Sequence, residues 1–223
     1  MREIPGIPYR FQDPQLLALA LSHRSVGHLN NERLEFLGDS ILNFVVSARL
    51  FDLNSDNNEG DLSRLRARVV RGVTLAKLAS ELKLGDYIKL GEGESKSGGY
   101  KRNSILADVL EAIFGAIYLD GGFEACERAI QHVCDPYIAG LPDAGDLKDA
   151  KTLLQEYLQG RGYGLPEYSL LQDLGPPHRK EFLIQCVNET AGIKVTGKGR
   201  SRRKAEQAAA AMALDFIAES PTG

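Results

Sequence analysis

Apolar residues recur at three- and four-residue intervals through most of the chain up to residue 139, and strand-like alternation is nearly absent there. This spacing places apolar side chains on one face of a helix and predicts a succession of helices. The predicted helices span residues 32–51, 62–71, 74–82, 104–119 and 122–138. Loops of small and polar residues are predicted between them, including 54–60 and the glycine-rich 91–99. The first part of the chain is therefore predicted to be all α-helical.

The pattern changes beyond residue 147. A helix is predicted over 148–161, and three short segments follow in which alternating apolar positions and turn residues indicate β-strands. These strands span 167–174, 180–188 and 193–197. A last helix is predicted over 201–218. Its expected apolar stripe consists of Ala205, Ala208, Ala209, Met212 and Phe216. The order α-β-β-β-α predicts a small α+β domain after the helical one.

Two domains fit the length of 223 residues, which is enough for two modest hydrophobic cores. A small, polar stretch interrupted by Gly140, Pro142 and Gly145 lies between the two patterns. We place an all-α domain at 1–140, a linker at 141–147 and the α+β domain at 148–220.

Composition argues against several classes of protein. No apolar run reaches the roughly 18 residues of a membrane-spanning helix, and the N-terminus lacks the apolar stretch of a signal peptide. We therefore expect a cytoplasmic protein with no membrane partner. Cys126, Cys134 and Cys186 are scattered and odd in number, which argues against a disulfide framework or a zinc site. Residues 151–223 hold 10 Lys and Arg against 8 Asp and Glu, a surplus too small to indicate a nucleic-acid partner by itself.

Three acids lie on one face of a predicted helix. Glu32, Glu35 and Asp39 stand at i, i+3 and i+7, which brings their side chains within a sector of about 60°. The helix over 32–51 is otherwise apolar nearly all round and is predicted to be central to the fold. Clustered carboxylates there would repel one another and lose hydration, at a cost on the order of several kcal/mol per unpaired charge, unless a cation compensates.

The same feature recurs in the helix over 104–119, which Ser104 is predicted to cap. Asp108 and Glu111 lie one turn apart on this second apolar helix. Any one acid could pair with a nearby base, such as Arg33 or Arg64, or face water. Two acid-bearing core helices together favour one shared cation site.

Carboxylates without a neighbouring histidine or cysteine cluster favour a hard ion, and Mg²⁺ fits them better than zinc. Such an ion can activate water and stabilise the leaving oxygen of a phosphodiester displacement, so no protein nucleophile is required. The four histidines are dispersed, and the sequence carries no serine-hydrolase, Walker or dinucleotide-binding motif. His23 is predicted to be a structural or substrate-side residue. The residues thus predict metal-dependent hydrolysis without an organic cofactor.

Three segments resemble the conserved blocks of the ribonuclease III family. They are NERLEFLGDS at 31–40, EGDLSRLRA at 59–67 and SILADVLEAIFGAIYLD at 104–120. The first is highly specific, and the three stand in the family's order. The resemblance implies an endoribonuclease that cuts double-stranded RNA with Mg²⁺, or with Mn²⁺ as an alternative ion.

The resemblance also implies roles for individual residues. The family's metal ligands match four acids of this chain: Glu35, Asp39, Asp108 and Glu111. Among them, Asp39 and Glu111 are implied to matter most for the chemistry. Glu32 and Glu59 match glutamates that assist at the cleavage site, although spacing alone reads Glu59 as an ordinary loop acid.

The family further implies a homodimer whose two sites cut the two strands, leaving 5′-phosphates, 3′-hydroxyls and short 3′ overhangs. Phe36 matches a family residue that inserts into the partner subunit, whereas periodicity alone predicts a core residue. Processing of ribosomal-RNA precursors and of messenger RNA is an expectation at the level of the family.

The C-terminal segment resembles a double-stranded-RNA-binding domain, which reads A-form RNA through contacts to 2′-hydroxyls and phosphates. The matching residues fall in three regions: Thr152, Gln155 and Glu156 in the first helix, His178 in the loop between the first two strands, and Arg202, Arg203 and Lys204 at the start of the last helix. Cations at a helix N-terminus oppose the helix dipole, and a bound polyanion would explain their placement.

Two other functions stay open on the residues. A protein that binds duplex RNA without cutting it needs only the second domain, and the intact acids argue against this reading. A metal phosphohydrolase for small nucleotides needs only the first domain, and the appended RNA-binding domain argues against that one.

Overall fold

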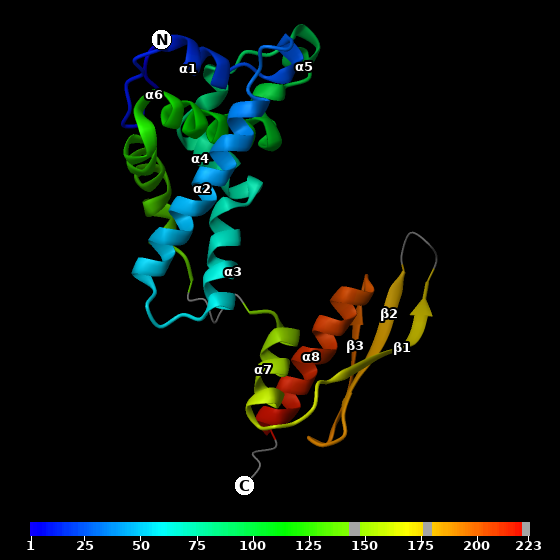
Figure 1. Cartoon of the computed structure of the whole chain (residues 1–223). Coiled ribbons are helices and arrows are strands. Elements are labelled where there is room, and N and C mark those ends of the chain that lie inside the picture. The colour runs from blue at the N-terminus through cyan, green and yellow to red at the C-terminus, as the bar shows by residue number, and fades with distance from the viewer. Residues whose placement is uncertain (143–147, 176–179, 220–223) are drawn as a thin grey trace. The chain divides into compact units, whose positions relative to one another are not determined.

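The structure of the chain is a computed structural model that describes residues 1–142, 148–175 and 180–219 (Figure 1). Its backbone forms two compact units, Met1–Asp146 and Leu147–Gly223. The first unit is helical and the second has the order α-β-β-β-α, which confirms the predicted fold class. Most of the predicted linker lies outside the described residues.

The first unit is built from six α-helices and three short 3-10 turns within its described residues. The helices are α1 (Pro14–Ala20), α2 (Glu32–Leu53), α3 (Glu59–Val70), α4 (Gly72–Glu81), α5 (Glu92–Lys96) and α6 (Asn103–Ile138). The turns are η1 (Arg24–Val26), η2 (Leu84–Asp86) and η3 (Gly99–Lys101). The five helices predicted from periodicity are all present, and the two predicted at 104–119 and 122–138 are the halves of α6.

The two helices predicted at 104–119 and 122–138 meet at a kink inside α6, where Gly122 adopts a non-helical φ of +79° that glycine enters without a steric penalty. Two other local predictions need adjustment. The predicted loop at 91–99 contains α5, whose first turn carries two acids that complement the helix dipole. Ser104 does not cap α6, because the helix already begins at Asn103.

The core of the first unit surrounds α6. Helices α1, α2 and α4 pack against α6, and α3 packs against α2 (Figure 1). Fully buried side chains at this centre include Leu110, Ile113, Phe114 and Ile117 of α6 and Leu42 of α2. Because α2 and α6 share the largest helix contact, the acids that they carry are brought near one another.

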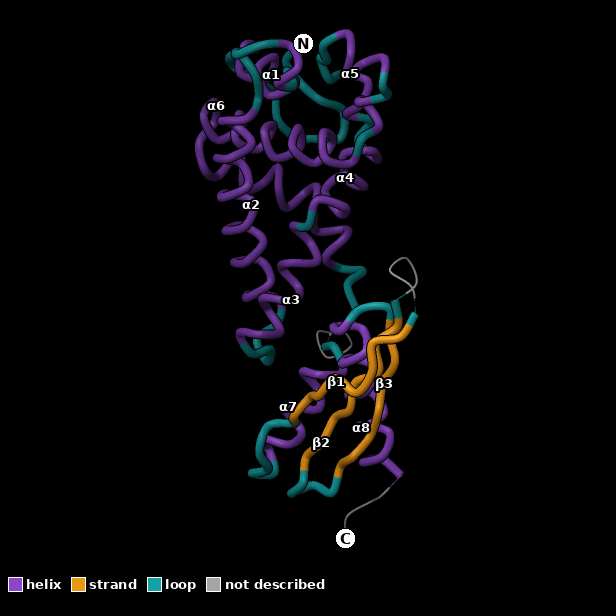
Figure 2. Tube along the Cα trace, turned by 90° about the vertical axis from the view of Figure 1, so that its right-hand side faces the viewer, coloured by secondary structure: helices purple, strands orange, loops and turns teal. Residues whose placement is uncertain are grey.

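The second unit is a three-stranded antiparallel sheet with helices on one face (Figure 2). The strands β1 (Glu167–Leu174), β2 (Glu181–Asn188) and β3 (Ile193–Gly199) are ordered β1-β2-β3. The helices α7 (Ala150–Gly160) and α8 (Arg202–Glu219) pack against each other. The core between these helices and the sheet includes Leu154, Leu158, Cys186, Ile193 and Ala209.

The predicted apolar stripe of α8 is partly wrong. The helix buries Ala205, Ala209, Ala210 and Ala213, small residues that let it lie close to the sheet. Met212 and Phe216 are exposed and line a shallow groove beside Val195 of β3. The buried face of α8 is therefore rotated from the face that periodicity predicted.

All three cysteines are buried and free. None of the helices that the structure describes is both long enough and apolar enough to cross a membrane.

Candidate active site

Helices α2 and α6 cross at an unusually short distance because a glycine of each lies at the contact. A β-carbon added to Gly38 would overlap the backbone carbonyl oxygen of Glu111, and one added to Gly115 would overlap that of Leu34. The two backbones therefore touch. Gly38 lies three residues after Glu35, so the crossing draws the acid-bearing faces of both helices together.

An acid cluster forms at this crossing. Glu35 of α2 and Asp108 and Glu111 of α6 each offer one carboxylate oxygen, and these oxygens lie within 4.8 Å of one another. They are three of the four predicted metal ligands. The fourth, Asp39, is exposed and outside this group, and its carboxylate accepts a hydrogen bond of 2.8 Å from the Asn43 side chain.

The three clustered carboxyls are destabilised in their charged form. Burial, followed by the charges of Asp39, Glu35 and Asp108, raises the pKa of Glu111 from 4.5 to about 8. Burial also raises the pKa of Glu35, with Asp108 as the next cause, and burial raises that of Asp108. The charge of Asp39 thus reaches Glu111 although its side chain points into solvent. This is the electrostatic cost that the sequence predicted for clustered acids.

The donor set fits a hard divalent cation. All three ligand atoms are carboxylate oxygens, which suit Mg²⁺ or Mn²⁺, and three of them leave coordination positions for water or phosphate oxygens. A bound cation would offset the repulsion that raises the three pKa values. Asp39 would join the ligands by turning from Asn43, directly or through a water.

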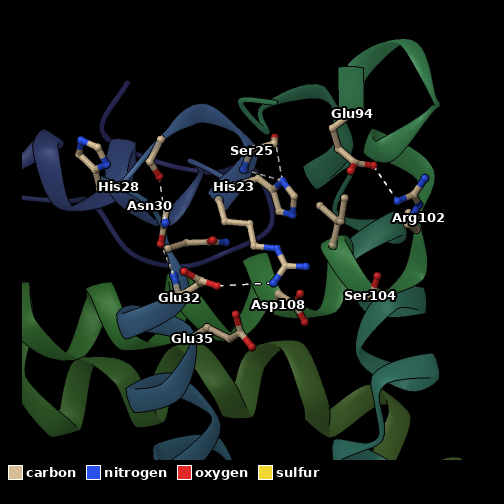
Figure 3. Close-up of a pocket in the computed structure, with 14 residues that line it drawn as sticks. His23, Ser25, His28, Asn30, Glu32, Glu35, Glu94, Arg102, Ser104 and Asp108 are labelled. Carbon is tan, nitrogen blue, oxygen red and sulfur yellow. Dashed lines mark hydrogen bonds and ion pairs between the residues drawn. The ribbon is translucent and has the colours of Figure 1, made fainter. Parts of the chain in front are cut away.

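A pocket of about 950 Å³ opens beside the acid cluster (Figure 3). Glu32, Glu35 and Asp108 line one side of it, and His23 lies across from them. Glu32 is exposed, and its carboxylate lies 3.7 Å from the guanidinium of Arg24. The predicted acid Glu32 therefore borders the site.

Arg24 is a site residue that sequence reasoning missed. The bases considered as partners for the acids were Arg33 and Arg64, yet Arg64 binds Asp61 within α3. Arg24 faces the acids, and its charge lowers the pKa of Glu35 against the effect of burial. It lies in the short turn η1, where no helical periodicity marks one face as functional.

Glu59 lies away from the acid cluster, and Phe36 is not a core residue. Glu59 begins α3, is exposed, and accepts a hydrogen bond of 2.9 Å from Ser63. Glu32 begins α2, and Glu59 follows the other end of this helix. The 22 residues of α2, about 33 Å of helix, therefore separate the two acids. Phe36 is 78% exposed in the single chain, so the reading of this position as core is wrong.

Two of the three predicted RNA-binding regions are brought together in the second unit. Thr152, Gln155 and Glu156 lie on α7, and Arg202, Arg203 and Lys204 are exposed at the start of α8. The N-terminal parts of these helices are joined where Lys151 Nζ contacts the Glu206 carboxylate at 2.7 Å. Glu156 also pairs with Lys148 at 2.7 Å. His178 lies outside the described residues.

Comparisons with known proteins agree with this architecture. A family model described as Ribonuclease-III-like matches residues 13–136, and one for the double-stranded RNA binding motif matches residues 150–217. Curated proteins named Ribonuclease 3 from Bordetella pertussis and Hahella chejuensis are each 52% identical over 209 residues. These residues make up 94% of this chain and 82% and 92% of the respective relatives.

A solved structure gives the same result for the first unit. The nuclease domain of ribonuclease III from Campylobacter jejuni is 43% identical and superposes with a TM-score of 0.58, covering 60% of this chain and 97% of that domain. With both domains matched in order and relatives more than half identical over most of both chains, the protein belongs to the ribonuclease III family of double-stranded-RNA endoribonucleases.

Proposed function

We propose that this chain cuts double-stranded RNA by Mg²⁺-dependent hydrolysis at the acid cluster, with Glu35, Asp39, Asp108 and Glu111 as the ligand set. The observation that carries the proposal is the convergence of three carboxylate oxygens within 4.8 Å where two helix backbones touch. Buried acids with raised pKa values are typical of functional sites.

Each group has a chemical part in this proposal. When bound, a divalent cation supplies an activated water and stabilisation of the leaving oxygen. Glu35, Asp108 and Glu111 would hold this cation, and the close contact of the two helix backbones keeps the three carboxylates near one another. Glu32, at the border of the site, is placed to orient the attacking water or the scissile phosphate. In the proposed step, water attacks the phosphorus and the bond to the 3′ oxygen breaks, which leaves a 5′-phosphate and a 3′-hydroxyl.

An exposed aromatic face on α2 supports a homodimer. Phe36, Phe44 and Phe51 are 78%, 61% and 69% exposed, and Phe44 stacks edge-to-face on Phe123 of α6 at 5.7 Å. Single exposed apolar residues are ordinary, but a row of three phenylalanines on one helix is a typical contact surface. The Campylobacter jejuni structure is described for flexibility in the region involved in dimer formation of its nuclease domain.

Phe36→Asp is expected to convert the dimer to monomers, because each of the two symmetric contacts would bury a charge without a partner. Light scattering after gel filtration at micromolar concentration measures the mass. Phe216→Asp, which changes an exposed phenylalanine of the second unit, is the matched control and should stay dimeric. A Phe36→Asp protein that remains dimeric would contradict this use of the α2 face.

Two-fold symmetry would also give Glu59 a role that it lacks within one chain. Suppose that the aromatic faces of two α2 helices pack antiparallel. The C-terminal end of one α2, which leads to Glu59, then lies beside the N-terminal end of the partner's α2, which carries Glu32. Glu59 would then border the acid cluster of the other subunit. The overhangs follow from two such sites cutting opposite strands.

Subunit mixing tests the role of Glu59 across subunits. Dimers of Glu59→Ala alone and of Glu111→Gln alone are expected to cut slowly, since every site lacks one group. A mixed dimer should regain one intact site and nick one strand of a labelled duplex. The control is a chain that carries both substitutions, because no site in its dimer is intact. Failure of the mixed dimer to recover, with exchange verified by mass, would place Glu59 outside the site.

The second unit is proposed to hold the duplex. Gln155, Arg202, Arg203 and Lys204 are exposed, and the N-terminal parts of the helices that carry them are joined. Exposed cations that face phosphates make binding fall with salt concentration. Ribosomal-RNA precursors and messenger RNA in the cytoplasm are the proposed substrates, on the strength of the family.

Product analysis tests the proposed reaction. A duplex RNA labelled on either strand should be cut on both strands in Mg²⁺ and on neither in EDTA. The products should carry 5′-phosphates and should leave 3′ overhangs of constant length. Products with 5′-hydroxyls would contradict the proposed departure of the 3′ oxygen.

A further inference from the structure

The loop that leads into α2 faces the acid cluster across the pocket. We infer that His23, Arg24 and Asn31 of this loop form a phosphate-binding wall, which holds an RNA backbone phosphate beside the one that is cut. This inference rests on the proposed function and specifies which residues of the nuclease domain grip the substrate.

Asn31 provides the first argument. Its side chain is buried, with 2% of its surface exposed, and it lines the pocket. Its Nδ2, a hydrogen-bond donor, has no partner among the residues that the structure describes. Asn31 stands at the N-cap of α2, but its side chain makes no capping hydrogen bond there. A buried donor without a partner is costly, so an acceptor is expected to enter the pocket.

His23 is fixed so that it presents a donor to the same pocket. The Gly91 amide donates to Ser25 Oγ at 2.9 Å, which leaves the Ser25 hydroxyl hydrogen for Nδ1 of His23 at 2.9 Å. The Ser25 amide also donates to this nitrogen at 3.2 Å. Nδ1 is therefore the acceptor, and the proton resides on Nε2. This nitrogen points away from Ser25 (Figure 3) and has no hydrogen bond in the described part of the chain.

Arg24 supplies the charge. Its side chain is 71% exposed and lies 3.7 Å from Glu32, beyond hydrogen-bonding distance. Only charge attraction, and no hydrogen bond, joins the guanidinium to Glu32. It is therefore able to turn toward an anion and donate two parallel hydrogen bonds to it. Arg102, the other arginine of the pocket, is bonded to Glu94 at 2.8 Å and is less available.

A phosphate accompanied by a divalent cation suits both sides of the pocket. A lone cation would suit the acids but would be repelled by Arg24, and a lone anion would suit the donors but would be repelled by Glu35 and Asp108. A phosphodiester backbone accompanied by a divalent cation satisfies the acids and the donors together.

The salt dependence of duplex-RNA binding tests the charge on this wall. Full-length Glu111→Gln protein serves as the background, so that binding is measured in Mg²⁺ without turnover. Adding Arg24→Ala is expected to lower the slope of log affinity against log salt by about one per subunit. Arg128→Ala is the matched control, since Arg128 is 68% exposed and lies 4.0 Å from Glu124. Equal slopes for the two variants would overturn the inference.

Asn31→Leu tests the buried donor separately from folding. Because Nδ2 has no partner in the described chain, the melting temperature should stay unchanged or rise, while duplex cleavage falls about ten-fold. Cleavage at the wild-type rate, or a drop in melting temperature that accounts for the loss, would contradict a phosphate contact.

Wild-type protein that fails to cut in Mg²⁺ would refute the proposed function. Wild-type cutting with Arg24 and Asn31 variants that behave as their controls would refute the phosphate wall alone.

Discussion

Glu111→Gln is expected to slow cleavage of duplex RNA by about a thousand-fold while RNA binding remains. Glu111 is the most buried acid of the cluster, and its oxygen lies within 4.8 Å of those of Glu35 and Asp108. The amide keeps the shape of the side chain but removes a negative ligand, and a misplaced cation forfeits several kcal/mol of transition-state stabilisation, at about 1.4 kcal/mol per ten-fold in rate. Single-turnover cleavage of a labelled duplex measures the loss. Glu124→Gln, an exposed change on the same helix, should cut at the wild-type rate.

The same variant should change the pH dependence of stability. The pKa of Glu111 is raised from 4.5 to about 8, so the folded protein holds this proton more tightly than the unfolded chain. The stabilisation is fully present below pH 4.5 and is lost as the pH rises to about 8. In EDTA, Glu111→Gln should therefore become more stable relative to wild type across that window, as followed by denaturant unfolding. Added Mg²⁺ should stabilise wild type more than the variant. A pH-independent difference would contradict the ionised cluster.

Gly38→Ala is expected to lower the free energy of unfolding by about 3 kcal/mol and to reduce cleavage by about a hundred-fold. The added methyl group would occupy the position of the Glu111 carbonyl oxygen, so α2 and α6 must separate. Overpacking of this kind costs about 1–3 kcal/mol, and a displacement of about 1 Å at reacting groups costs about a hundred-fold in rate. Denaturant unfolding and single-turnover cleavage measure the two effects.

Gly72→Ala is the matched control for the helix crossing. Gly72 begins α4, and a β-carbon added there meets nothing within 4 Å. Its replacement should leave cleavage unchanged and stability equal or slightly higher, because alanine restricts the unfolded chain. Gly115→Ala, at the other half of the crossing, should behave as Gly38→Ala. A Gly38→Ala protein as stable and active as Gly72→Ala would contradict the close contact.

Much of this organisation could be predicted from the sequence because helical periodicity is a local property. The spacing of Glu35 from Asp39, and of Asp108 from Glu111, indicated acids on two apolar helices and thus one shared site. The structure brings Glu35, Asp108 and Glu111 together. It leaves Asp39 on the solvent side of α2, because Asp39 lies about 100° around the helix from Gly38 at the crossing, whereas Glu35 lies only about 60° from it.

Other features depend on the tertiary structure and have no local signal. Periodicity reads Phe36 as a core residue, because it cannot distinguish a face that packs within the chain from a face available to a partner. Arg24 and Asn31 lie in and beside a short turn, where no repeat assigns a direction to side chains. The buried face of α8 differs from the predicted one because alanines form its closest contact with the sheet. Alanine is only weakly hydrophobic, so the pattern pointed to Met212 and Phe216 instead.

The most direct test of the account compares wild-type and Glu111→Gln proteins on one duplex RNA labelled at both 5′ ends. Complexes form in EDTA, gel shift verifies equal binding, and excess Mg²⁺ starts the reaction. Wild type is predicted to cut both strands only after Mg²⁺ is added, and the variant is predicted to bind but remain about a thousand-fold slower. Cleavage by wild type in EDTA, or equal rates for the two proteins in Mg²⁺, would contradict the assignment of the acid cluster as the metal-dependent site.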